Sequence, residues 1–224
     1  MTSTIPTQNS RVTPLSKTAR IMVRHMTQAW QAPMFGLVTE VDMSAAMAKR
    51  PAGITVTDVI LAACVGALGE HPRFNAHYAD EAVIEYDDVN IGLAVASEKG
   101  LTVPVIHAAQ TLSLPELGAK RRDLIEKTRS GRIKVTEVTG GTFTVSNLGM
   151  FDITRFTAII NPPQVAILAV GSVIRRQLWN DGDPQWRQIA EFSLTCDHRA
   201  IDGAAGAAFL GTLKKRLETS SGAQ

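Results

Sequence analysis

A histidine and an aspartate four residues apart follow a segment in which apolar and polar side chains alternate. His198 is separated by Asp197 alone from residues 190–196, whose alternation predicts a strand buried on one face. A neutral imidazole at a strand end can accept a proton near pH 7, because its unperturbed pKa is about 6.5. Asp202 can anchor the loop through an arginine or backbone N–H groups, and Gly203 permits a tight turn. The alternative is purely structural, with His198 half-buried and hydrogen-bonded and Asp202 capping a helix.

A serine at the end of another expected strand is the second candidate. Residues 140–145 alternate as a strand does, and Ser146 begins the expected turn, Ser146–Gly149. A hydroxyl at a strand end can donate a hydrogen bond to a developing oxyanion. It can equally bond its own backbone in the turn. No Gly-x-Ser-x-Gly elbow surrounds Ser146, so a covalent nucleophile is not indicated.

The composition narrows the class of protein. The chain has 224 residues, of which 45% are hydrophobic and 20% charged, with a net charge of +2. These values are typical of an ordinary globular chain and do not favour a nucleic-acid-binding protein. We expect no membrane span, no secretion signal, and no disulfide framework or metal site from the two cysteines, Cys64 and Cys196. A reducing cytoplasm is the expected compartment.

The elements that must position these side chains are indicated by hydrophobic periodicity. The pattern predicts one α+β domain with a mixed sheet over residues 11–217, between a flexible tail (1–10) and a polar tail (218–224). Thr57 and Asp58 are plausible capping residues for a buried helix, and Ser97–Gly100 is typical of a hairpin turn. Helices are expected at 15–29, 44–50, 57–68, 114–128 and 209–217, and strands at 35–41, 83–86, 89–96, 101–106, 140–145, 157–160, 165–173 and 190–196.

Several motifs occur in the order and spacing of one family. They are Pro14–Ser16, Val41–Ser44, Gly100–Val105, Gly141–Gly149, Ile160–Gln164, Val165–Gly171 and Asp197–Gly203. Over residues 12–217 the chain resembles the catalytic domain of the dihydrolipoamide acyltransferases, the core component of the 2-oxoacid dehydrogenase complexes. The resemblance implies a fold like that of chloramphenicol acetyltransferase, a two-layer sandwich with a mixed sheet covered by helices.

The resemblance also implies roles for the candidate residues. His198 matches the general base that takes the proton from the thiol of coenzyme A or of dihydrolipoamide, and transfer is direct, without an acyl-enzyme. Ser146 matches the hydroxyl that hydrogen-bonds the tetrahedral oxyanion, and Asp202 matches the carboxylate that braces the loop. In the family the site lies between subunits of a homotrimer, with the histidine and the serine on different chains.

Coenzyme A needs cationic partners for its phosphates. The first helix of the family usually carries two arginines at the positions of Ala19 and His25. We therefore expect a neighbouring set, Lys17, Arg20 and Arg24, together with Asn147, to bind coenzyme A. The alternative is that these basic residues form only the solvated face of an amphipathic helix.

Two further departures from the family concern the acyl group and the assembly. Asp152 stands where glycine is frequent in the family, and it either repels an anionic acyl group or caps a turn. The chain has no lipoyl-type Asp-Lys-Ala motif, so we expect a partner protein or dehydrogenase-complex subunit to supply the lipoyl group in trans. The polar C-terminal tail favours an isolated trimer over a 24- or 60-subunit cage.

The leading hypothesis is therefore an acyltransferase that moves an acyl group between coenzyme A and a dihydrolipoyl thiol. The first alternative is a stand-alone enzyme that transfers from acyl-CoA to a small hydroxyl or amine. The second is a non-catalytic assembly subunit with the same fold.

Overall fold

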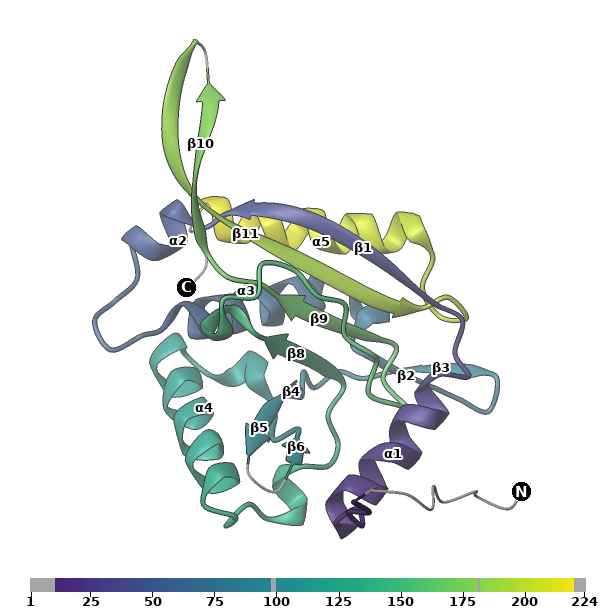
Figure 1. Cartoon of the computed structure of the whole chain (residues 1–224). Helices are drawn as coiled ribbons and strands as arrows, with labels where there is room; N and C mark the ends of the chain where they lie inside the picture. Colours follow the sequence, from purple (N-terminus) through teal and green to yellow (C-terminus); the bar gives the residue numbers. More distant parts are fainter. Residues whose placement is uncertain (1–10, 98–99, 181, 220–224) are drawn as a thin grey trace.

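A seven-stranded mixed sheet forms the centre of the computed structural model, which describes residues 11–97, 100–180 and 182–219 (Figure 1). The strands lie in the order β1-β11-β9-β8-β4-β7, and β10 pairs with the remaining length of β11. β8 runs parallel to β4 and β9, whereas the other pairs of this sheet are antiparallel. The predicted α+β class with a mixed sheet is confirmed. The strands are β1 (Met34–Asp42), β4 (Ile91–Leu93), β7 (Val105–Ile106), β8 (Phe143–Asn147), β9 (Ala166–Val170), β10 (Ile174–Asn180) and β11 (Asp183–Asp197).

Helices cover one face of this sheet and enclose the main core. Helix α5 packs against α3 and β1, and α4 packs against α3. The apolar side chains of β8, β9 and β11 alternate toward this layer, where Phe143, Phe192 and Phe209 are fully buried. The burial of such side chains stabilises each by about 1.5–3 kcal/mol. The helices are α1 (Lys17–Ala29), α2 (Ser44–Ala48), α3 (Val56–Glu70), α4 (Leu114–Arg129) and α5 (Gly203–Thr219).

The buried helix α3 begins one residue before the predicted range of 57–68, and its cap lies two residues before the predicted cap. Its cap is Thr55, which forms a reciprocal capping box with Asp58, rather than Thr57. The Asp58 carboxylate is fully buried, and Nε of Arg121 lies 2.6 Å from its Oδ1. Burial raises the pKa of Asp58, but hydrogen bonds from Arg121 and Thr55 outweigh that effect and hold the pKa below its ordinary value. This ion pair fixes the start of α3 against α4.

The other face of the sheet is covered by the C-terminal end of α1 and by an irregular segment, residues 152–164. Ala29, Ala32, Ile160 and Ile167 form a second, smaller core there. The strand predicted at 157–160 is wrong, because these residues have no ladder partner. Both edges of β9 are already occupied by β8 and β11, so the segment lies over the face of the sheet instead of joining it.

Glycine allows this segment to approach the sheet closely. A Cβ atom on Gly171, just after β9, would lie 1.9 Å from the carbonyl oxygen of Thr154. The neighbouring Ser172 donates its N–H to the carbonyl of Ile153 at 2.8 Å. The end of β9 and the irregular segment therefore lie so close together that any side chain at position 171 would clash with the segment.

Several strand boundaries differ from the predictions. The strand expected at 89–96 is divided into β4 and β5 (Val95–Ser97), and the one at 101–106 into β6 (Gly100–Thr102) and β7. Pro104 lies at the second division and has no N–H for a ladder. The hairpin predicted around residue 98 is confirmed as β5–β6, although Glu98 and Lys99 lie outside the described residues. A small sheet of β2 (Ala76–Ala79) and β3 (Ala82–Glu85) contains one unpredicted strand, β2.

The hairpin formed by β10 and the first part of β11 extends away from the body of the molecule (Figure 1). Trp179 and Trp186 on this hairpin are 76% and 59% exposed. The sequence pattern did not predict it, because both of its faces carry polar residues and no alternation marks a buried side. No helix in the part of the chain that the structure describes is long and apolar enough to span a bilayer.

The predicted tails lie mostly outside the described residues. Residues 1–10 and 220–224 are not described, whereas Glu218 and Thr219 continue α5. Glu218 accepts a hydrogen bond from the backbone N–H of Asp42 at 3.0 Å. The last helix therefore ends two residues later than expected.

Candidate active site

His198 lies in the turn between β11 and α5, as the sequence indicates. Its backbone N–H donates to the carbonyl of Pro33 at 3.0 Å, which joins the turn to the segment after α1. Its ring is exposed and lies 4.7 Å from the ring of Phe35, between centroids. Phe35 belongs to β1 and is itself packed against the main core. The imidazole is thus supported by an aromatic ring on one side and is accessible from solvent.

Asp202 caps α5. Its Oδ1 accepts a hydrogen bond from the N–H of Ala205 at 2.8 Å, and its carbonyl accepts the N–H of Gly206 at 3.0 Å. Of the two possibilities for anchoring the loop, a backbone N–H, and no arginine of the described residues, bonds this carboxylate. An N-cap side chain satisfies an otherwise unpaired helical donor, so Asp202 fixes where the His198 turn ends.

Two residues beside His198 form a contact that sequence reasoning missed. The Asp197 carboxylate is buried and accepts hydrogen bonds from the backbone N–H of Arg199 at 3.0 Å and from its Nη2 at 2.6 Å. The Arg199 guanidinium lies over the ring of Tyr78, 4.0 Å from its centroid. The signal in the sequence was the pair of opposite charges on either side of the histidine.

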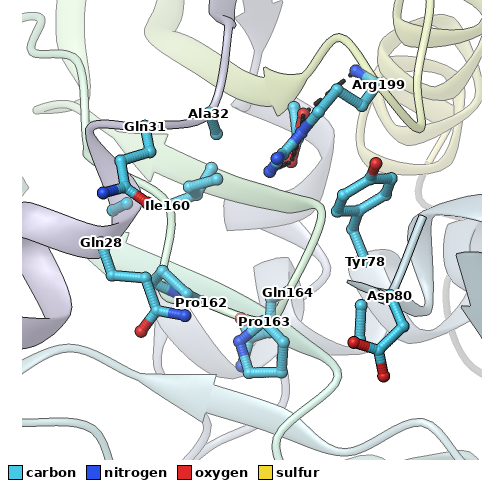
Figure 2. A pocket seen from close by; sticks show the side chains of 13 residues that line it. Gln28, Gln31, Ala32, Tyr78, Asp80, Ile160, Pro162, Pro163, Gln164 and Arg199 are labelled. Atoms are coloured by element: carbon cyan, nitrogen blue, oxygen red, sulfur yellow. Dashed lines mark hydrogen bonds and ion pairs between the residues drawn. The ribbon is translucent and has the colours of Figure 1, made fainter. Parts of the chain in front are cut away.

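A cavity of about 310 Å³ lies beside this contact (Figure 2). Its lining combines amides, an aromatic ring and a guanidinium, from Gln28, Gln31, Gln164, Tyr78 and Arg199. In Figure 2 the guanidinium of Arg199 and the ring of Tyr78 lie along one side, opposite Gln28 and Gln31. The polar lining can bind a ligand that carries amides or hydroxyls.

Ser146 lies inside β8 rather than in an exposed turn after it, which corrects the prediction. It is 8% exposed, and its strand is paired on both sides, with β4 and β9. The next residue, Asn147, accepts the N–H of Gly149 at 2.8 Å and donates its Nδ2 to Thr57 of α3 at 3.2 Å. Ser146 is thus held at a position fixed by a strand on each side and by the start of a helix.

Ser146 and His198 lie far apart within one chain. Ser146 pairs with Ala169 of β9, and Ala169 pairs with Ser193 of β11. Ser193 precedes His198 by five residues. At about 3.3 Å per residue along a strand and 4.8 Å between strands, the two Cα atoms are on the order of 20 Å apart. One chain therefore does not bring both side chains to a single reacting carbonyl.

The basic residues expected to bind coenzyme A lie on α1. Arg20 and Arg24 are exposed, and neither guanidinium forms an ion pair with a carboxylate of the described residues. Lys17 begins the helix, but its side chain lies outside what the structure describes. At about 1.5 Å per residue, Arg24 and Arg20 lie about 8 Å and 14 Å along the axis from Ala29, the end of α1 nearest the His198 turn.

Asp152 occupies a turn. It ends a short 3-10 helix, Gly149–Phe151, and adopts a left-handed backbone with φ of 58°. Glycine adopts this conformation without strain, and aspartate is one of the few other residues that tolerate it. Of the two readings of this position, the structure supports the turn.

The described residues hold no group of three or more histidine, cysteine, aspartate or glutamate side chains that could bind a metal ion. Both cysteines are buried and unpaired. Burial raises the pKa of Cys196, two residues before His198, to about 12. Its thiol is therefore protonated near pH 7 and points into the core rather than toward His198.

A family model, curated relatives and solved structures match most of this chain. The family model of the 2-oxoacid dehydrogenases acyltransferase (catalytic domain) matches residues 7–223. The chain is 41% identical over 170 residues to the dihydrolipoyllysine-residue acetyltransferase component of the pyruvate dehydrogenase complex of Rickettsia bellii, an alignment that covers 76% of this chain and 41% of that relative. The chain thus spans about two fifths of the relative's length.

Solved structures agree with the family match. A structure of the Azotobacter vinelandii dihydrolipoamide acetyltransferase superposes with a TM-score of 0.89 at 34% identity, covering 93% of this chain and 91% of that one. That study concerns a serine, a histidine and an asparagine of its catalytic mechanism, which are separated by the same intervals as Ser146, His198 and Asp202.

A chloramphenicol acetyltransferase matches with a TM-score of 0.60 at 17% identity, over 87% of this chain and 94% of that one, which shows a shared fold. The predicted chloramphenicol-acetyltransferase-like fold is confirmed. The chain belongs to the family of 2-oxoacid dehydrogenase acyltransferase catalytic domains.

Proposed function

We propose that this protein transfers an acyl group between coenzyme A and a dihydrolipoyl thiol, with His198 as the general base. The observation that carries the proposal is the arrangement of Ser146, His198 and Asp202, whose spacing equals that of the catalytic serine, histidine and asparagine of the Azotobacter enzyme. Acetyl is the first acyl group to test, because the Rickettsia relative is an acetyltransferase.

The reaction follows from the properties of these side chains. The neutral imidazole of His198 takes the proton of the attacking thiol, and the thiolate adds to the thioester carbonyl of the other substrate. The hydroxyl of Ser146 donates a hydrogen bond to the oxyanion that forms. The intermediate then expels the second thiolate, which receives the proton back from the imidazolium. Proton transfer of this kind contributes about 10²–10⁴-fold, and one oxyanion donor about 10²–10³-fold.

The active site is formed between two chains of a homotrimer. The register of β8, β9 and β11 separates Ser146 from His198 by on the order of 20 Å in one chain. The attacking thiol must lie within hydrogen-bond reach of His198 while the carbonyl oxygen that it attacks lies within reach of Ser146, so both side chains must meet at one reacting centre. A neighbouring subunit that supplies Ser146 next to His198 meets this requirement, and a cyclic arrangement repeats it three times.

Coenzyme A and the lipoyl group are held by different groups. Arg20 and Arg24, exposed and without carboxylate partners among the described residues, bind the phosphates of coenzyme A together with Lys17, and Asn147 lies beside Ser146 at the start of α3. The lipoyl group is carried by a partner protein of a dehydrogenase complex. The two buried, unpaired cysteines fit the reducing cytoplasm that we propose as the compartment.

The proposal is tested by incubating the purified protein with acetyl-CoA and a panel of acceptors. We expect transfer to free dihydrolipoamide and little transfer to alcohols or amines, with activity lost in His198→Ala while the oligomer is retained. Transfer to a hydroxyl or amine alone would establish the stand-alone acetyltransferase instead. An absence of transfer with every acyl-CoA and acceptor would support a non-catalytic subunit.

A further inference from the structure

The turn that carries His198 is closed by an ion pair between its two neighbours. The Asp197 side chain is 2% exposed, and besides the backbone N–H of Arg199 it accepts the Nε of that residue at 2.9 Å. The same guanidinium reaches the other carboxylate oxygen through Nη2 at 2.6 Å. A bidentate guanidinium–carboxylate pair has a fixed planar geometry. Because the pair joins the residues before and after His198, it restricts the backbone of His198 itself.

A second element holds this pair in place from outside the turn. Tyr78, on β2, presents its ring to the Arg199 guanidinium at 4.0 Å (Figure 2). The backbone of Tyr78 donates to the carbonyl of Pro163 at 2.8 Å, which ties β2 to the segment on the far face of the sheet. Arg73, just before β2, donates its Nε to the carbonyl of Ala200 at 3.1 Å. The turn is therefore anchored at two points by the same region of the chain.

The ring of His198 depends on this anchoring. It is exposed, and among the described residues no group hydrogen-bonds either of its nitrogens. Its contact with a side chain is the ring of Phe35, which supports one side only. The direction of the imidazole is thus set by the backbone of the turn rather than by a bond to the ring.

We propose that Arg199 and Tyr78 are positioning residues for His198 in acyl transfer, with Asp197 as the buried carboxylate that orients Arg199. The inference rests on the proposed function. Arg199 is partly exposed, with a side-chain exposure of 39%, but Asp197 is 2% exposed, so removal of the guanidinium leaves a buried carboxylate with fewer donors and is expected to lower the stability of the fold as well. A positioning role therefore requires a loss in the rate of the chemical step, measured where each variant is folded, in addition to any loss of stability.

The test compares Arg199→Ala and Tyr78→Leu with two controls. Arg132→Ala removes an arginine that also pairs with a carboxylate, Glu126 at 2.7 Å, but lies on the surface near α4. Tyr78→Phe is the second control, because it keeps the aromatic ring that faces the guanidinium.

We expect Arg199→Ala and Tyr78→Leu to lower kcat by about ten-fold to a hundred-fold, because displacement of a catalytic group by about 1 Å costs up to about 10²-fold. The KM for acetyl-CoA should stay within about two-fold, and added guanidinium ions should restore part of the kcat of Arg199→Ala.

Tyr78→Phe should retain most of the kcat that Tyr78→Leu loses, and Arg132→Ala should match the original protein. Three results would overturn the inference: a kcat of Arg199→Ala within two-fold of the original, a loss confined to KM, or equal losses in Tyr78→Phe and Tyr78→Leu. An original protein that transfers no acyl group would instead contradict the proposed function.

An NMR measurement tests the inference without relying on enzymatic activity. The ring current of Phe35 displaces the NMR signals of the His198 ring. This displacement should change in Arg199→Ala and persist in Arg132→Ala. Unchanged His198 signals in Arg199→Ala would show that the pair does not position the ring.

Discussion

Ser146 and His198 are held in different ways at the scale of single residues. Ser146 is nearly buried in a strand with a partner on each side, so the position of its backbone is fixed before any substrate binds. Such preorganisation is what makes an oxyanion donor effective. His198 is exposed on a turn and takes its orientation from Phe35 and from the backbone around it. The serine should therefore act on the transition state, and the histidine should be the more sensitive to its surroundings.

The substitution Ser146→Ala should lower kcat for acetyl transfer to dihydrolipoamide by about 10²–10³-fold, because it removes one oxyanion donor. The KM for acetyl-CoA should change little, since the hydrogen bond forms in the transition state. Steady-state kinetics measure both. Ser172→Ala is a matched control, because Ser172 is also buried and its hydroxyl has no hydrogen-bond partner in the described structure. A change confined to KM would make Ser146 a binding residue.

Because Asp202 acts as a helix cap, we expect its negative charge to be dispensable for the stability of the fold. An asparagine at this position offers the same Oδ1 acceptor to the N–H of Ala205. Asp202→Asn should keep the free energy of unfolding close to the original value, whereas Asp202→Ala should lower it by about 1 kcal/mol. Denaturant titration of both variants gives the comparison. Equal destabilisation by the two substitutions would show that the negative charge itself is needed.

At the scale of elements, the start of α3 depends on the pair of Asp58 and Arg121. Removing one partner of a buried pair leaves an uncompensated charge, so Arg121→Met should lower the free energy of unfolding by about 3–5 kcal/mol. The pKa of Asp58 lies below its ordinary value of 3.8 in the folded chain. The stabilisation by this pair is therefore fully present above about pH 4 and is lost as the pH falls through the folded pKa.

Denaturant unfolding between pH 2 and pH 6 measures this dependence. The double variant Asp58→Leu/Arg121→Met should recover part of the stability and lose the acid-side slope that this pair causes. A single variant Arg121→Met as stable as the original protein would contradict the account of this pair.

The sequence predicted the elements that have a buried side. The alternation in residues 190–196 corresponds to β11, although this stretch is buried on both faces rather than on one, and the apolar run in residues 57–68 corresponds to the buried helix α3. The hairpin of β10 and β11 was missed because it is exposed on both faces. The segment around Ile160 was wrongly predicted as a strand, since local pattern does not tell whether a sheet has a free edge. Asp197 and Arg199 were missed because their contact depends on the turn geometry.

At the scale of the whole molecule, the proposed active site requires two chains, because Ser146 and His198 lie far apart within one chain. The residue types and the order of Ser146 and His198 could be predicted from the sequence. The distance between them follows only from the strand register. Ala169 of β9 pairs with Ser146 on one side and with Ser193 on the other, so Ser146 lies level with Ser193 rather than with the end of β11. Activity should therefore require assembly, and dilution that dissociates the trimer should abolish it.

The central claim, that each site combines His198 of one subunit with Ser146 of another, is tested most directly by mixing two inactive variants. His198→Ala and Ser146→Ala are co-expressed in equal amounts, and acetyl transfer by the mixed trimers is compared with that of each variant alone. In a cyclic trimer with random mixing, about one site in four receives an intact histidine and an intact serine. We predict recovery of about a quarter of the original activity. Mixed trimers no more active than the two separate variants would contradict the shared site.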